Sequence, residues 1–342
     1  MEDKKIILDV KNLNTSFKSD GKLIKIVKDV SFQLEKGRSL AIVGESGCGK
    51  SVTVHSVTRL MAKNSVISSD HVIYRKFNED GTAKEYRIDK MSNYGKEMRS
   101  LRGPEISMVF QDPMASLNPV YRVGDQIIEG LLEHNPGMKK DDAMKMAIEL
   151  LKKLGIPAPE QRVKDYPHQL SGGMKQRIVI AIALICNPEL IIADEPTTAL
   201  DVTIQAQIME LLKKIQVELN KSIILITHNM GLVTEMADDV IVMYMGRIVE
   251  KGTLKDIFNA PSHPYTKMLL ASVPVLGMAQ GQKLTTIPGS TPNPADLTEG
   301  CEFADRCPYC TDECRKGRIP GYEVSEGHMV RCRKFAGNKE VD

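Results

Sequence analysis

The feature that most constrains this chain is a glycine-rich loop that follows an apolar run of strand length at 39–43. It matches the pattern G-x-x-x-x-G-K-[ST], in which a loop joins a strand to a helix and holds phosphate groups. Its glycines let backbone N–H groups surround a β-phosphate, Lys50 reaches the β- and γ-phosphates, and the Ser51 hydroxyl ligates Mg²⁺. The predicted nucleotide contacts are Gly44, Glu45, Ser46, Gly47, Cys48, Gly49, Lys50, Ser51 and Val52.

Short apolar runs alternate with helical patterns along the chain. The runs of strand length are at 6–10, 39–43, 190–194 and 223–227. The last two each have four consecutive apolar residues before a final polar one, as in strands buried on both faces of a parallel sheet. Between them, residues 201–220 have helical spacing after a capping Asp201. This alternation predicts an α/β fold, and residues 240–252 predict a hairpin that turns at Gly246.

Two carboxylates end the apolar run at 190–194. Asp194 is placed to hold Mg²⁺ through water, and Glu195 is placed to polarise an attacking water as a general base. An apolar run followed by two acids is a weak sign alone, because such carboxylates also cap helices. Together with the upstream phosphate-binding loop it predicts nucleotide hydrolysis.

A third segment, LSGGMKQR at 170–177, predicts a helix capped by Ser171, with exposed backbone N–H groups at Gly172 and Gly173. Such a helix end attracts anions, and a capped helix without a ligand is the alternative. With all three motifs in this order, residues 5–255 resemble the ATPase subunits of ABC transporters, with Met174 in place of the usual glutamine. In that family this segment binds the γ-phosphate of ATP held by the opposite subunit.

The resemblance implies roles for further residues. Gln111 in VFQDP is similar to the Q-loop glutamine, which senses Mg²⁺ and couples to the membrane subunit, and Asp201 resembles the D-loop aspartate at the dimer contact. His228 resembles the switch histidine that contacts the γ-phosphate. Phe17 stands where an A-loop aromatic stacks on adenine, and a buried core phenylalanine is the alternative. The implied catalytic set is Lys50, Gln111, Glu195 and His228, and the implied Mg²⁺ ligands are Ser51, Gln111 and Asp194.

The resemblance also implies an organisation. We expect a P-loop NTPase fold with a RecA-like core, an antiparallel β subdomain and a helical insertion. Residues 1–256 would form the ATP-binding domain, with the helical subdomain at about 113–178, where 143–155 is amphipathic. Residues 257–342 would form a small extension, which is loop-rich because prolines break up the chain there. Its cysteines predict that this extension binds metal.

The extension holds five of the seven cysteines, of which four have the spacing C-x5-C-x6-C-x17-C: Cys301, Cys307, Cys314 and Cys332. In a reducing cytosol such a group indicates metal binding before disulfides. Four thiolates suit zinc or an iron–sulfur cluster, and free cysteines in a flexible tail are the third possibility. The wide gaps differ from the CxxC pairs of many zinc ribbons.

The segment at 258–274 and the cysteine pattern resemble the ATPase subunits of dipeptide, oligopeptide and nickel importers. That resemblance implies a [4Fe–4S] cluster, with Cys310 left unassigned. It also implies two transmembrane permeases, an extracytoplasmic peptide-binding protein and a second ATPase, either a related chain or a second copy. Peptides are the expected cargo and nickel is the alternative.

Charge and hydropathy indicate neither a nucleic-acid partner nor a segment that spans a membrane. The net charge of +2 gives no argument for a nucleic-acid partner. The N-terminus does not have the features of a signal peptide, and the longest apolar run, 178–186, is far shorter than the ~20 residues that span a bilayer. We therefore expect the chain to stay in the cytosol, and the resemblance to importer ATPases implies peripheral attachment, through partner permeases, at the cytoplasmic face of the plasma membrane.

Two other functional classes fit this sequence less well. A soluble ABC ATPase acting on nucleic acid or ribosomes often has a coiled-coil insertion or two fused units, and neither is visible in this sequence. A metal-binding regulatory module with a vestigial ATPase is disfavoured because Lys50, Asp194, Glu195 and His228 are all intact.

Overall fold

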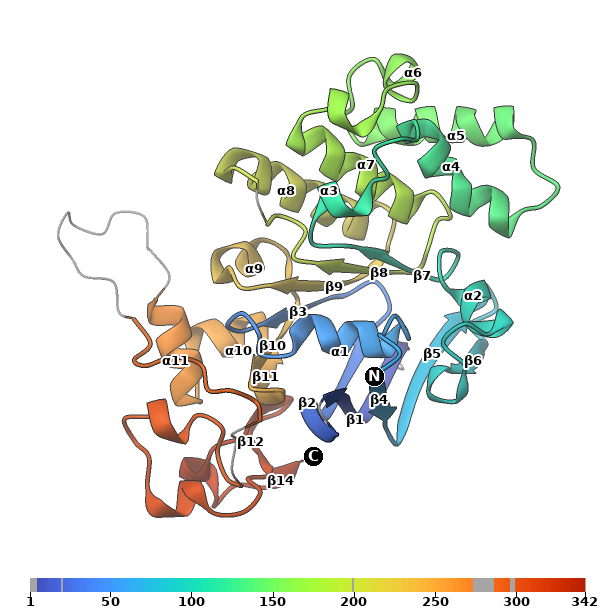
Figure 1. Ribbon diagram of the computed structural model, residues 1–342. Coiled ribbons are helices and arrows are strands. Elements are labelled where there is room, and N and C mark those ends of the chain that lie inside the picture. Colours follow the sequence, from blue (N-terminus) through green and yellow to red (C-terminus); the bar gives the residue numbers. More distant parts are fainter. Residues whose placement is uncertain (1–4, 20, 199, 273–285, 296–298, 342) are drawn as a thin grey trace, which may run out of the picture.

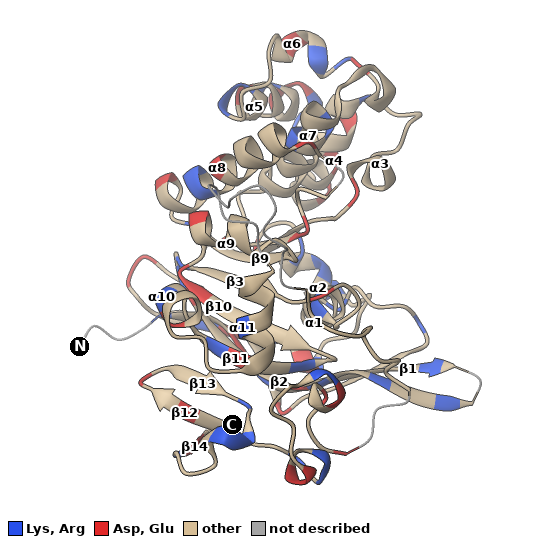
Figure 2. Ribbon diagram, turned by 90° about the vertical axis from the view of Figure 1, so that its left-hand side faces the viewer, with Lys and Arg blue, Asp and Glu red and all other residues tan. Residues whose placement is uncertain are grey.

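The computed structural model describes residues 5–19, 21–198, 200–272, 286–295 and 299–341. Two sheets form its frame, and a group of helices lies at one end, at the top of Figure 1. Within these residues, no helix combines the length and the apolar character needed to cross a bilayer. Basic and acidic residues are interspersed along the ribbon (Figure 2).

The large sheet has the strand order β14-β12-β13-β11-β10-β3-β9-β8-β7. Its central strands run parallel, from β10 through β3, β9 and β8 to β7, and β11 pairs antiparallel with β10. These strands are β3 (Ser39–Val43), β7 (Ile106–Val109), β8 (Leu190–Asp194), β9 (Ser222–Thr227), β10 (Asp239–Tyr244) and β11 (Arg247–Thr253). Every residue of β3, β8 and β9 is buried, which confirms the prediction of strands covered on both faces.

Successive side chains of β8 enter two different cores, as the pleat of a strand requires. Ile191 and Ala193 pack with the helical group and with α8 (Val202–Glu218) and α9 (Met230–Met236). Leu190 and Ile192 pack on the other side with α1 (Lys50–Val57) and the antiparallel sheet. The sheet is thus a middle layer.

The antiparallel sheet is formed mainly from the N-terminal part of the chain and has the order β2-β1-β5-β6, with β4 also paired to β1. Its strands are β1 (Ile6–Ser19), β2 (Lys22–Glu35), β4 (Ser65–Ser68), β5 (His71–Phe77) and β6 (Ala83–Arg87). The predicted strand at 6–10 is therefore the start of a longer one. The short helices η1 (Ile88–Lys90) and α2 (Lys96–Leu101) follow β6 and lead back to the large sheet.

The expected insertion at about 113–178 is mostly helical. It contains α3 (Pro113–Ser116), α4 (Val123–His134), α5 (Lys140–Lys153), α6 (Pro159–Arg162), η2 (Pro167–Gln169) and the start of α7 (Gly172–Leu184). The amphipathic pattern corresponds to α5, after which Gly155 adopts φ 73°. Asp201 caps α8 as predicted, because its carboxylate accepts from the N–H of Ile204 at 3.0 Å.

The C-terminal extension is joined to the large sheet. Strand β13 pairs with β11, so β12 to β14 continue the sheet past its edge (Figure 2). The predicted boundary at 256 falls inside α10. The elements are α10 (Leu254–Asn259), α11 (Pro264–Ala271), η3 (Ala304–Arg306), η4 (Asp312–Arg315), β12 (Gly321–Ser325), β13 (His328–Val330), η5 (Arg333–Phe335) and β14 (Glu340–Val341).

Candidate functional site

The phosphate-binding loop joins β3 to α1, as its motif predicts. Gly44, Gly47 and Gly49 adopt φ 150°, 79° and 99°, values that favour glycine. A Cβ at Gly44 would lie only 2.3 Å from the carbonyl oxygen of Met243, whereas one at Gly47 would meet nothing within 4 Å. The N-terminus of α1 has no side-chain cap, so its backbone N–H groups are available to an anion.

Lys50 and Ser51 connect this loop to the end of β8. The Lys50 ammonium is buried and donates to the carbonyl oxygens of Gly44, at 2.8 Å, and Glu45, at 2.9 Å. The Ser51 hydroxyl donates to Oδ1 of Asp194 at 2.8 Å. Two predicted Mg²⁺ ligands from distant motifs therefore lie within hydrogen-bonding distance of each other.

Glu195 is the centre of a second cluster. One carboxylate oxygen accepts from Nε2 of Gln111 at 3.0 Å and from the hydroxyl of Thr198 at 2.8 Å. The other oxygen lies 3.3 Å from Nδ1 of His228. Glu195 has φ 45°, a conformation that is uncommon for a residue with a side chain and recurs at functional sites. The structure thus brings together three residues of the implied catalytic set, from three separate segments.

The segment at 170–177 lies apart from these clusters, at the start of α7 in the helical group (Figure 1). Ser171 caps the helix, since its side chain accepts from the N–H of Met174 at 3.4 Å. Ser171 and Gly172 are exposed, whereas a Cβ at Gly173 would lie 3.1 Å from the Ile204 side chain. Gly173 therefore also allows α7 to approach α8 closely.

Phe17 lies in β1, where it is opposite Ile24 of β2 and Ser65 of β4. Its side chain is only half-buried and does not belong to the buried core residues. Part of the ring is therefore accessible to a stacking partner, which is compatible with the predicted adenine contact.

Two residues beside the clusters were not predicted from the sequence. Thr198 donates to Glu195, and Nε2 of His55 lies 3.3 Å from Oδ2 of Asp194. The signal for His55 was its spacing, because positions four apart share one face of a helix and Ser51 is four residues earlier. Thr198 has no such local signal, since threonines near a turn are common.

The five cysteines of the extension line one cavity of about 170 Å³, together with Phe303, Ile319 and other side chains. Burial raises the pKa of Cys301 to about 12 and also raises the pKa values of Cys307 and Cys332. The thiols are not joined by disulfides. Across the described part of the chain, no three His, Cys, Asp or Glu side chains are arranged to hold a metal ion, so the structure does not support the prediction of a metal-binding extension.

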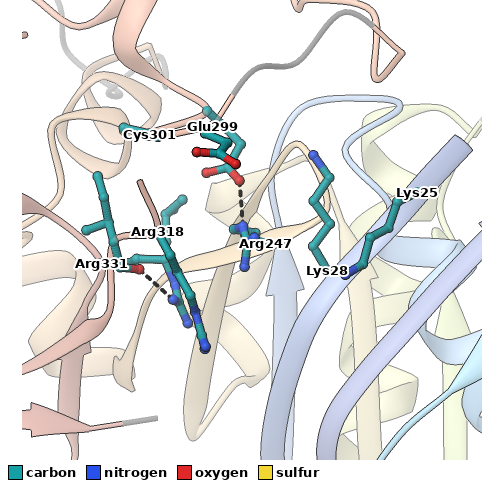
Figure 3. Close-up of a pocket in the computed structure, with 11 residues that line it drawn as sticks. Lys25, Lys28, Arg247, Glu299, Cys301, Arg318 and Arg331 are labelled. Atoms are coloured by element: carbon teal, nitrogen blue, oxygen red, sulfur yellow. Dashed lines mark hydrogen bonds and ion pairs between the residues drawn. The ribbon is translucent and has the colours of Figure 1, made fainter. Parts of the chain in front are cut away.

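A larger pocket of about 580 Å³ lies between β2, β11 and the extension (Figure 3). Lys25, Lys28, Arg247, Arg318 and Arg331 line it. Much of this positive charge is compensated. Arg247, for example, pairs with Asp29 at 2.8 Å and with Glu302 at 2.5 Å. The pocket is separate from the phosphate-binding loop, whose residues do not line it.

Comparisons with known proteins agree with this geometry. Residues 27–198 match the family described as "ABC transporter", and residues 249–314 match "Oligopeptide/dipeptide transporter, C-terminal region". A dipeptide transport ATP-binding protein of Bacillus subtilis is 51% identical over 327 residues, which cover 95% of this chain and 94% of that protein. An oligopeptide transport ATP-binding protein of the same organism is 48% identical and covers 95% of this chain and 96% of its own length.

Solved structures show the same fold. The chain is similar to the dimeric, post-hydrolysis ATP-binding cassette MJ0796 bound to ADP and Pi, with a TM-score of 0.60 and 27% identity. That match covers 72% of this chain and 98% of the other. A second similar structure is cbiO1 of Clostridium perfringens, with a TM-score of 0.58, 28% identity, and coverage of 75% and 92%.

Proposed function

Since the chain belongs to the ABC transporter family, we propose that it hydrolyses ATP to drive the import of di- or oligopeptides. The observation that carries the enzymatic part is the Glu195 cluster, which joins a carboxylate to Gln111, Thr198 and His228. The cargo follows from the relatives named for dipeptide and oligopeptide transport and from the match of the C-terminal region. These names favour peptides over nickel.

The residues of the loop fit ATP and Mg²⁺. The uncapped N-terminus of α1 and the Lys50 ammonium offer donors to phosphate oxygens. The Ser51 hydroxyl and the Asp194 carboxylate meet at 2.8 Å and supply the oxygen ligands that Mg²⁺ prefers, with Gln111 as a third candidate. Bound Mg²⁺ would neutralise charge on the phosphates. Phe17 would contact the adenine ring.

Glu195 is the proposed general base. Its carboxylate is only 12% exposed and is held from both sides, so its oxygens keep a fixed direction. It would accept a proton from the attacking water, while His228 and Gln111 hold the carboxylate in place.

Each site would be completed by a second ATPase, either a related chain or a second copy. Ser171 and Gly172 are exposed on the helical group, away from the loop of their own chain, and Asp201 is exposed beside them at the start of α8. This position suits contact with ATP held by the opposite subunit. The similar cassette MJ0796 is itself dimeric.

A surface patch suits a membrane partner. Four exposed apolar side chains, here called the apolar patch, lie around the segment after β7: Phe110, Met114, Val120 and Tyr121. Several exposed apolar side chains within one segment favour a contact site. We assign the patch to a permease, one of two, which would hold the chain at the cytoplasmic face of the plasma membrane. An extracytoplasmic peptide-binding protein would deliver the cargo.

We further propose that Cys301, Cys307, Cys314 and Cys332 hold a [4Fe–4S] cluster. The support is that all four cysteines line one cavity, because four thiolates are the usual ligands of such a cluster. Cys310 lines the same cavity and is the spare thiol.

The catalytic assignment is tested by Glu195→Gln. The amide can place its oxygen toward Gln111 and Thr198 and its NH₂ toward His228, so the fold should be kept. Loss of the base should lower the ATPase rate by about 10²–10⁴-fold with nucleotide binding retained. Glu235→Gln, on the exposed side of α9, is the control. An E195Q protein that hydrolyses ATP at the normal rate would remove Glu195 from this role.

The cluster is tested on protein purified anaerobically. We expect about four iron and four sulfide per chain, with visible absorbance. Cys307→Ser should lose most of the iron, whereas Cys310→Ser should keep it. One zinc per chain without sulfide would overturn the assignment.

A further inference from the structure

The second residue of the phosphate-binding loop, Glu45, is held by two residues of the C-terminal extension. Its carboxylate accepts from Nη1 of Arg306 at 2.7 Å and from Nη2 at 3.0 Å. Its backbone N–H donates to the Tyr265 hydroxyl at 2.8 Å. Arg306 lies 261 residues after Glu45, so this contact depends on how the extension packs.

Arg306 is itself fixed on several sides. Its side chain is only 6% exposed. Nε donates to the carbonyl oxygen of Pro288 at 2.8 Å, and Nη1 also donates to the Tyr244 hydroxyl at 3.2 Å. The guanidinium lies 5.8 and 5.9 Å from the ring centroids of Tyr244 and Phe303. A bidentate pair of this kind fixes the direction of the Glu45 carboxylate as well as its position.

Tyr265 is equally constrained. It is fully buried in α11 and packs against the rings of Tyr244, at 4.7 Å, and Phe303, at 5.4 Å. A buried ring with this packing has one rotamer, so its hydroxyl is a fixed acceptor. It satisfies the N–H of Glu45 at the first turn of the loop.

Glu45 transmits this constraint to the nucleotide site. Its carbonyl oxygen accepts from Nζ of Lys50 at 2.9 Å, beside the contact from Gly44. A displacement of Glu45 therefore displaces an acceptor that holds the ammonium expected to bind phosphate. These contacts therefore connect the extension to Lys50 through Glu45.

We propose that Tyr265 and Arg306 are positioning residues through which the C-terminal extension holds the phosphate-binding loop in the shape that binds nucleotide. This role rests on the proposed ATPase function and gives the extension a part in nucleotide affinity. Since the contacts organise the loop before hydrolysis, their loss raises KM for ATP more than it lowers kcat.

The test is a double-mutant cycle on the full chain. Arg306→Gln, Glu45→Gln and the double variant are compared for kcat, for KM and for the Kd of trinitrophenyl-ATP, a fluorescent analogue. Loss of one charge-assisted bidentate contact should raise KM and Kd by about tenfold, with kcat changed less than about twofold. The double variant should be no worse than either single one, because both remove the same contact.

Two further variants test the proposal even if R306Q does not fold. Tyr265→Phe removes only the hydroxyl and should raise KM about threefold without loss of the folded state. Arg306→Lys keeps the charge but not the two parallel bonds, and it should recover part of the affinity.

Arg331→Gln is the matched control. Arg331 is a buried arginine of the same extension, it directly precedes Cys332, and it donates to the carbonyl oxygens of Ile248 and Ile319. This variant should lower the unfolding midpoint and leave KM unchanged. The proposal would be overturned if R306Q and R331Q changed KM equally. It would also be overturned if the increases in KM caused by R306Q and E45Q multiplied in the double variant, because the two residues would then act independently. A wild-type chain that binds the analogue without hydrolysing ATP would refute the proposed function, and the Kd values would still test the positioning role.

Discussion

The exposed fractions of two side chains in the apolar patch predict how much their loss should weaken permease binding. Val120 and Tyr121 are 73% and 59% exposed, although the backbone around them is well held. The side chain of Gln126 donates to the carbonyl oxygens of Asn118 and Tyr121 at 3.0 Å each, and the N–H of Val120 donates to Asn118 at 3.2 Å. Two apolar side chains are therefore presented to solvent on a fixed turn.

Burying the exposed parts of both side chains against a permease should contribute about 3 kcal/mol, since full burial of each gives ~1.5–3 kcal/mol. Replacing both by serine should therefore weaken the complex about a hundredfold. Both side chains are exposed, so the free energy of unfolding of the isolated chain should change by less than about 0.5 kcal/mol.

The assay is co-purification with the permeases in detergent, followed by peptide uptake in reconstituted vesicles. The double variant V120S/Y121S should lose both co-purification with the permeases and peptide uptake, while the isolated chain keeps its basal ATPase rate. Val217→Ser is the control, because Val217 is 66% exposed on α8, outside the patch. A variant that binds and transports normally would refute the assignment of the patch to the permease.

Two further predictions concern stability. Burial alone would raise the pKa of Asp238, but hydrogen bonds from Ser39 and Gln216 hold it below its usual 3.8. Its stabilisation is therefore present above about pH 4 and is lost as pH falls through the folded-state pKa, so the unfolding free energies of wild type and D238N should converge in acid urea titrations. Gly246→Ala should cost more than about 2 kcal/mol in urea denaturation, because its Cβ would lie 2.0 Å from the Ile26 carbonyl oxygen at φ 85°. A G246A variant with the urea midpoint of the wild type would contradict the argument for Gly246. A difference in unfolding free energy between wild type and D238N that does not change with pH would contradict the argument for Asp238.

Much of the site could be predicted because its parts are local motifs. Lys50, Asp194, Glu195 and His228 each follow an apolar run that the structure confirms as a buried strand or its edge. The ends of parallel neighbouring strands meet at one edge of a sheet, so residues far apart in sequence come together there. The motif at a strand end was enough to anticipate Lys50, Asp194 and Glu195, whereas the roles of Gln111 and His228 were implied only by the resemblance to the ATPase family.

The contacts of the extension could not be predicted, for two physical reasons. Strands β13 and β14 are only three and two residues long, too short for a period of two to be recognised. The pairing of Arg306 with Glu45 spans 261 residues and depends on the packing of Tyr244, Tyr265 and Phe303, which no local pattern specifies. Neither a glutamate in the loop nor an arginine before a cysteine indicates by itself that the two side chains pair.

The donors around Glu195 connect the apolar patch to catalysis. A carboxylate has about four lone-pair positions, and Gln111, Thr198 and His228 face three of them. Among the described side chains this leaves one position for a water, so a change in any donor alters how that water would be held. Gln111 directly follows Phe110 of the patch, and a permease that moves this segment therefore moves a donor on the proposed base. The resemblance to ABC transporter ATPases implies this coupling role for Gln111, so Gln111→Ala should leave the apolar patch able to bind the permease while uncoupling hydrolysis from transport.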